Sequence, residues 1–196
     1  MTSLLRAELL KVRLTRTSVL LVVAGIGFAV FLGAVTASLA GREGNAPLGS
    51  AEMIENVVGV STIPAAFGLL LGVLLAAGEH QHGTITATYL AQPRRHLVVA
   101  AKAGAAAVAA GAVAAAMVAA AVAGAAPRLV LDGADVAVDA GVVTAVVGLV
   151  LGSALLAVIG VLLGHLLRSQ VAAIVAVVVW FTVLEAIADT LAGGGL

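Results

Sequence analysis

The chain alternates between long apolar runs and short polar breaks. Five runs, nearly free of charged residues, each hold about 20 residues, which is long enough for a helix to cross a hydrocarbon core of ~30 Å. We therefore expect transmembrane helices at about residues 18–39, 57–78, 103–126, 140–164 and 171–187. This pattern predicts an all-α membrane protein, a polytopic helical bundle in which residues 1–196 form a single transmembrane domain.

Composition supports a membrane protein independently of the pattern. Of the 196 residues, 62% are hydrophobic and 10% are charged, and the mean hydropathy is +1.20. A soluble domain has about 25% charged residues, so this chain has too little polar surface to cover a globule in water. The sequence contains no cysteine, which excludes disulfides, thiolate catalysis and cysteine-based metal sites.

Small residues indicate how the predicted spans pack. Glycines four residues apart let helix backbones approach closely. Three such pairs occur in the apolar runs: Gly68/Gly72, Gly148/Gly152 and Gly160/Gly164. The run at 103–126 is almost entirely alanine, valine and glycine, so we expect it to face other helices more than lipid. At the start of the second run, Pro64 predicts a kink, and the hydroxyls of Ser61 and Thr62 can bond the carbonyls that it frees.

The residues before the first run combine basic and apolar side chains. Leu5, Leu9 and Val12 fall on one face of a helix, with arginines and a lysine between them. One interpretation is a short amphipathic helix that lies on the inner leaflet. The other is a solvated basic tail that only orients the first span, and the residue pattern leaves both open.

Basic residues gather on one side of the predicted membrane, as lysine and arginine do in cytoplasmic loops. With five spans and a cytoplasmic N-terminus, the cytoplasmic segments are 1–17, 79–102 and 165–170. They hold eight of the ten basic residues, namely Arg6, Lys11, Arg13, Arg16, Arg94, Arg95, Lys102 and Arg168. Of the acidic residues, only Glu8 and Glu79 lie on this side. We therefore expect a multi-pass protein of the plasma membrane with its N-terminus inside.

The longest basic break, residues 79–102, carries the candidate functional residues. It begins E-H-Q-H-G-T, continues through P-R-R at residues 93–95 and ends at Lys102. Gly83 is expected to provide the sharp turn out of the second span. Arg94 and Arg95 are expected near anionic lipid head groups or acidic residues of a partner. A plainer interpretation is that these arginines only enforce the topology.

No motif for catalysis or nucleotide binding occurs in the chain. It lacks the G-x-x-x-x-G-K-[ST] phosphate loop and the H-E-x-x-H zinc motif, so we expect neither enzymatic activity nor a cofactor. His80, His82 and His96 can be drawn with Glu79 as a metal cluster. Without cysteine or a second close carboxylate, a solvated loop is the favoured interpretation, and no metal is expected.

These patterns together resemble the permease subunits of type-2 ABC transporters, the exporter branch that handles drugs, lipids and polysaccharides. E-H-Q-H-G-T at residues 79–84 is similar to the E-x-x-x-G-T that this family carries at the cytoplasmic end of its second span. P-R-R at 93–95 and Lys102 continue the likeness. L-R-A-E-L-L-K-V-R at residues 5–13 is similar to the family's amphipathic helix before the first span. The layout matches over the whole chain, and residues 79–102 are the more specific part.

The resemblance implies a function and partners. It implies a permease, of exporter type, that moves an unidentified substrate across the plasma membrane with ATP hydrolysis supplied by a separate ATP-binding subunit. A second permease subunit, identical or different, would complete the pathway in the lipid bilayer, and no nucleic acid is expected as a partner. The family's half has six spans, so this chain would lack the last. The residues implied for coupling to the ATP-binding subunit are Glu79, Gly83, Thr84, Pro93, Arg94 and Arg95.

An alternative function comes from a different class of protein. The three glycine pairs and the short chain also suit a non-transporting membrane anchor or an immunity-type protein that binds its partner through helix packing. This hypothesis predicts helix-mediated oligomers whose formation does not depend on any ATPase.

Overall fold

The computed structural model describes residues 2–42, 44–81, 83, 85–86, 90, 94–167 and 169–193, and within them it contains helices and no β-strand. The all-α prediction is therefore confirmed for this part of the chain. The helices are α1 (Thr2–Leu14), α2 (Arg16–Leu39), α3 (Ala51–Gly59), α4 (Thr62–Gln81), α6 (Arg95–Leu131), α7 (Ala140–Leu167) and α8 (Gln170–Gly193).

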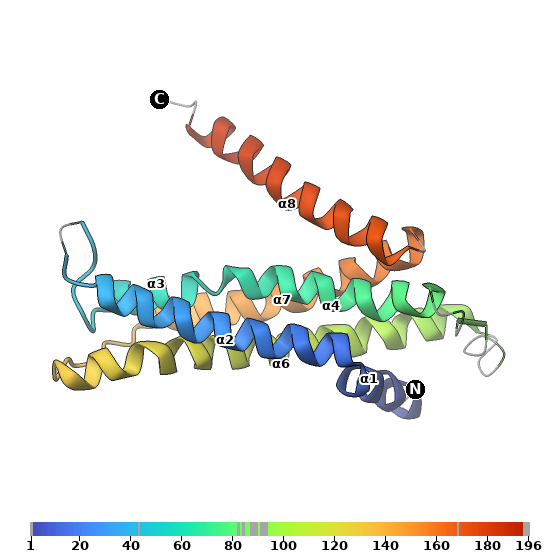
Figure 1. Ribbon diagram of the computed structural model, residues 1–196, viewed down its shortest axis with the longest axis horizontal. Helices are drawn as coiled ribbons and strands as arrows, with labels where there is room; N and C mark the ends of the chain where they lie inside the picture. Colours follow the sequence, from blue (N-terminus) through green and yellow to red (C-terminus); the bar gives the residue numbers. More distant parts are fainter. Residues whose placement is uncertain are drawn as a thin grey trace.

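The helices form an elongated bundle whose connections alternate between its two ends (Figure 1). α2, α3, α4, α6 and α7 run along one axis, α1 lies across one end, and α8 starts at that same end and diverges from the bundle. At the other end, the loops before α3 and α7 meet, where the amide of Ala137 donates a 2.9 Å hydrogen bond to the carbonyl of Gly49. We name the end with α1, the last turn of α4, the first turns of α6 and the α7–α8 connection the basic end.

Three helices are long and apolar enough to cross a membrane, namely α2, α6 and α7. α4 and α8 contain shorter apolar stretches, Phe67–Glu79 and Gln170–Val179, within the residues whose side chains are described. Four of the five predicted runs lie within single helices, and the second is divided between α3 and α4. The described residues show three helices with the length and composition of membrane spans.

The predicted second span is divided into two helices. α3 ends at Gly59 and α4 begins at Thr62, so the run at 57–78 is interrupted at its start instead of forming one continuous helix. The hydroxyl of Ser61 donates to the carbonyl of Val57 at 3.4 Å, as expected for a hydroxyl beside a helix break. Pro64 then falls in the first turn of α4, where its missing N–H removes no helix hydrogen bond.

α6 is longer than the run that predicted it. It begins at Arg95, so the last eight residues of the predicted polar break form its first two turns, and it continues through Pro127 to Leu131. In its most apolar stretch 39% of the residues are buried, against 17% in α2 and 22% in α7. This alanine-rich helix is therefore the most buried of the three, in the direction of the expectation that it packs against other helices. Its small side chains leave room for neighbours on several sides.

Glycines set the close approach of α4 to α7. A Cβ atom added to Gly72 would overlap the carbonyl oxygen of Ala157, and one on Gly160 would overlap that of Leu69. Gly68 and Gly164, the other members of the two pairs, also leave too little space for a Cβ between these helices. Two of the three predicted pairs therefore serve packing within the chain. Gly148 and Gly152 have no described atom within 4 Å of an added Cβ.

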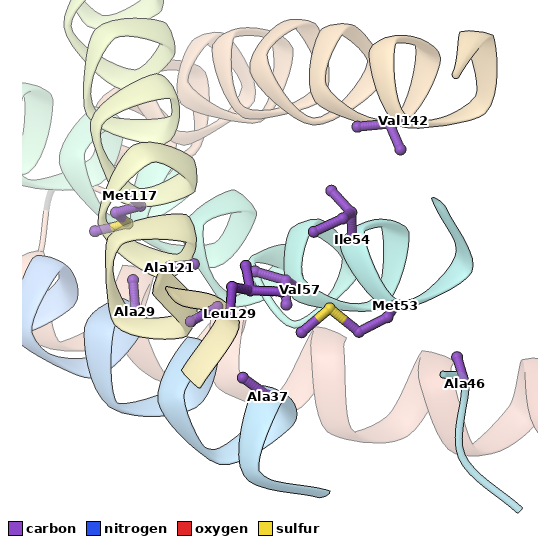
Figure 2. Close-up of a cluster of buried hydrophobic side chains, with 11 residues drawn as sticks. Ala29, Ala37, Ala46, Met53, Ile54, Val57, Met117, Ala121, Leu129 and Val142 are labelled. Atoms are coloured by element: carbon purple, nitrogen blue, oxygen red, sulfur yellow. The ribbon is translucent and has the colours of Figure 1, made fainter. Parts of the chain in front are cut away.

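Most core side chains between the helices are alanine or valine, with a few leucines, two methionines and one isoleucine among the described residues. Figure 2 shows one cluster, in which side chains of α2, α3, α6 and α7 point toward one another; it includes Ala29, Val57, Met117, Ala121 and Val142. A second cluster joins α4, α6 and α7 near the basic end, and Val12 of α1 packs against it. The core thus extends along the bundle and includes α1.

Candidate functional site

Four charged side chains from three helices meet at the basic end. The ammonium nitrogen of Lys102 lies 2.7 Å from Oε2 of Glu8 and 3.1 Å from Oε1 of Glu79. The ammonium nitrogen of Lys11 lies 2.7 Å from Oε1 of Glu8 and 2.6 Å from Oε1 of Glu79. Each lysine therefore contacts both carboxylates. We name these four residues the ionic cluster.

Local sequence places each member of the ionic cluster. Glu8 and Lys11 are three residues apart on α1, so both point to the same side of that helix. Glu79 stands in the last turn of α4, and Lys102 in the second turn of α6. α1 is held against α6 by apolar contact as well, because Leu5 lies 3.3 Å from the position of a Cβ on Gly104.

Burial makes the pairing in this cluster necessary. The side chain of Lys102 is wholly buried, those of Glu8 and Glu79 are 3% and 10% exposed, and that of Lys11 is 43% exposed. An isolated buried charge is costly, whereas two cations and two carboxylates in contact neutralise one another. Burial by itself lowers the pKa of Lys11, but hydrogen bonds to Glu79 and Glu8 outweigh it and hold that pKa above its usual value. Lys11 is therefore cationic at neutral pH.

The structure separates the predicted coupling residues into two groups. Glu79 is buried in the ionic cluster, whereas Arg94 and Arg95 are exposed at the start of α6. Gly83 has a φ of 68°, a left-handed conformation that favours glycine, so the predicted turn after α4 is confirmed. Thr84 and Pro93 lie outside the described residues.

The predicted alternative of a metal site gains no support in the described part of the chain. No three histidine, aspartate or glutamate side chains there are placed to hold a metal ion. His96 is exposed in the first turn of α6. His82 and the side chain of His80 lie outside what the structure describes. The carboxylate of Glu79 is directed to two lysines.

Sequence reasoning missed that Glu8 and Lys11 belong to this site. A signal for them exists in the sequence, because Glu8 falls on the same helical face as Leu5, Leu9 and Val12. A charge on the apolar face of an amphipathic helix needs a partner. Glu8 and Glu79 are also the two acids on the predicted cytoplasmic side. The structure shows that they share the same two cations.

The cluster links both boundaries of the predicted polar break to the N-terminal helix. Glu79 opens residues 79–102 and Lys102 closes them, and these two residues form a direct ion pair. Glu8 and Lys11 attach α1 to that pair. A displacement of α1, of the end of α4 or of the start of α6 would therefore disturb the other two helices.

The described residues form a helical bundle with three helices of membrane-spanning length and composition, and with an ionic cluster at one end. No protein-family model, curated protein or solved structure matches this chain.

Proposed function

We propose that this chain is a transmembrane permease subunit of an ATP-driven transporter of exporter type in the plasma membrane, powered by a separate ATP-binding subunit. The observation that carries the proposal is the ion pair between Glu79 and Lys102, which joins the two ends of the polar segment 79–102 and ties them to α1. A segment held in this way transmits force to three helices when a soluble partner moves it. The absence of a phosphate loop in the sequence gives the chain a need for such a partner.

The two groups of coupling residues have different roles in this proposal. Arg94 and Arg95 are exposed, so they are the candidates for contact with acidic side chains of the ATP-binding subunit. Glu79 is buried and acts inside the chain, as the anchor between the segment and the ionic cluster. Gly83 provides the turn that directs the segment away from α4. Thr84 and Pro93 are proposed for contact from the family resemblance alone.

Orientation is part of the same proposal. The basic end faces the cytoplasm, because the segments at this end carry eight of the ten lysine and arginine residues. α4 and α8 complete a set of five spans with α2, α6 and α7. The ATP-binding subunit would then meet the protein at the end that holds α1 and the ionic cluster.

The proposal is tested by co-expression with an ATP-binding subunit encoded in an adjacent reading frame. We expect the tagged chain to retain that subunit in detergent and to stimulate its ATPase activity. The double change of Arg94 and Arg95 to Glu should reduce retention at least tenfold by reversing two contact charges. Arg42→Glu, an exposed arginine in the α2–α3 connection at the opposite end, is the matched control. No retention by the unchanged chain, or an equal loss in the control, would refute the proposal.

The alternative of a non-transporting anchor is favoured by one observation. A Cβ added to Gly148 or Gly152 of α7 would meet no described atom within 4 Å, and large side chains around them, such as Leu151 and Leu155, are exposed. A helix of another membrane protein could pack there through the small-residue pair. If Gly152→Leu abolishes oligomers in detergent while the ATPase partner is neither bound nor needed for the cellular phenotype, the anchor is the correct function. The permease proposal predicts that the phenotype requires ATP hydrolysis.

A further inference from the structure

A groove runs between α1, α2 and α6 at the basic end, and the ionic cluster does not line it. Its volume is about 670 Å³, within the range of small-molecule sites. Most of its lining is apolar and includes Leu9 and Val12 of α1, Val22 of α2 and Val113 of α6. Arg6 and Ser18 are the two polar residues among the described side chains that form it.

The charged side chains of α1 that the structure describes fall into two groups, one paired and one exposed at the groove. Glu8 and Lys11 face α4 and α6 and are paired there. Arg6 borders the groove, is exposed, and takes part in none of the ion pairs found among the described residues. Arg16 is exposed at the start of α2 and lies three residues before Val19, which lines the groove, so the two share a face of that helix. The groove therefore joins an apolar interior to a cationic rim.

We propose that this groove binds an anionic phospholipid, with one acyl chain between the three helices and the phosphate at Arg6. The groove reaches the lipid-facing surface, because Val19, Val23 and Val108 line it and are 45%, 61% and 57% exposed. An acyl chain gains affinity from each methylene that it buries, and a basic residue at the membrane surface attracts anionic head groups. The proposal requires that the chain is embedded in a membrane, and it is independent of transport or of an ATPase.

Two other occupants fit the groove less well. A free phosphate ester would bind Arg6, but it has no apolar part to occupy the interior of the groove. A zwitterionic phospholipid would fill the interior but would bring its own cation to a rim that is already positive. An anionic phospholipid matches both the apolar interior and the charge at its edge.

The test uses the purified full-length chain in detergent and native mass spectrometry with two lipids of identical acyl chains, phosphatidylglycerol and phosphatidylcholine. We expect tighter binding of phosphatidylglycerol. Arg6→Gln should weaken its binding about fivefold and should abolish the preference over phosphatidylcholine. Val23→Trp, at an exposed position that tolerates a larger side chain, should fill the groove and weaken both lipids. Excess glycerol 3-phosphate should displace neither.

Matched controls separate this site from general effects. Arg42→Gln removes an exposed arginine at the opposite end, and Leu162→Trp enlarges a 53% exposed side chain on α7, outside the groove. Both should bind phosphatidylglycerol like the unchanged chain. Equal binding of the two lipids by the unchanged chain, displacement by glycerol 3-phosphate, or full binding by Val23→Trp would each overturn the proposal. The circular dichroism of every variant checks that the helices are retained.

Discussion

At the scale of single residues, Lys102 has the least typical environment in the described structure. It is a lysine with no exposed surface, and it stands two turns into a helix that is otherwise almost entirely apolar. A buried ammonium group is tolerated when carboxylates replace the water that it has lost. Glu8 and Glu79 do so at 2.7 and 3.1 Å. The cluster joins three helices because the two carboxylates that Lys102 of α6 contacts come from α1 and α4.

Replacing Lys102 by methionine should destabilise the protein strongly. The change keeps an apolar chain of similar length but leaves two nearly buried carboxylates with only Lys11 as a counter-charge. We expect the free energy of unfolding to fall by about 3 kcal/mol, the lower end of values for breaking a buried pair. Chemical denaturation in detergent micelles, followed by circular dichroism, measures this loss.

Two further variants establish the cause of that loss. Adding Glu8→Gln to Lys102→Met should cost less than the two single changes together, because the unpaired carboxylate has been removed. Arg128→Met breaks an exposed ion pair with Asp132 and should cost no more than about 1 kcal/mol. A loss for Lys102→Met as small as that for Arg128→Met would contradict the structural role of the cluster.

At the scale of elements, contacts between backbones determine how the long helices pack. α4 and α7 approach through Gly72 and Gly160, where no Cβ separates one helix from a carbonyl of the other. α2 and α6 pack in the same way, since a Cβ on Gly124 would overlap the carbonyl oxygen of Val30. Close packing of this kind supplies van der Waals contact in lipid, where the hydrophobic effect does not drive helices together.

Gly72→Ala and Gly78→Ala should have opposite effects on stability, although both lie on α4. The methyl group at Gly72 would collide with Ala157 and force the helices apart, which we expect to cost about 1–3 kcal/mol. Gly78 has open space, so alanine there should stabilise the helix by up to about 1 kcal/mol. Denaturation of both variants under the same conditions provides the comparison. Equal destabilisation would show that α4 and α7 are packed differently.

At the scale of the whole molecule, the bundle gathers segments that are far apart in the sequence. α1, the last turn of α4, the first turns of α6 and the start of α8 meet at the basic end, and Gly49 and Ala137 of the loops before α3 and α7 meet at the other (Figure 1). This up-and-down arrangement agrees with the alternation of basic and acidic breaks in the sequence. It gives the protein two chemically different ends.

Labelling of introduced cysteines can determine the orientation of these ends, because the natural chain has no cysteine to react. Arg42→Cys and Arg94→Cys place exposed thiols at the two ends. We expect a membrane-impermeant maleimide to label position 42 in intact cells and position 94 only after permeabilisation. The reverse pattern would show that the basic end faces outward and would remove the basis for a cytoplasmic ATP-binding partner.

Much of the fold could be predicted because its signals are local. The apolar runs predicted the helices, and Gly83 predicted the turn after α4. The basic breaks predicted which segments share one end of the bundle. The interruption of the second run lies at Val60 and Ser61 instead of at Pro64, and α6 begins at Arg95, eight residues before its predicted start. Helix ends depend on packing of the flanking residues as much as on their type.

For the candidate site, the sequence shows that Glu79 and Lys102 bound a polar segment and that basic and apolar residues alternate before the first span. That these residues form a helix, α1, follows from the structure. The arrangement of the helices in space, and no local pattern, makes Glu8 the nearest carboxylate to Lys102, 94 residues away in the sequence. That contact depends on how α1 lies across the bundle and on Gly104, which lets Leu5 come close. Residue patterns report which groups need partners. The partners themselves are chosen by packing between elements that are distant in the chain.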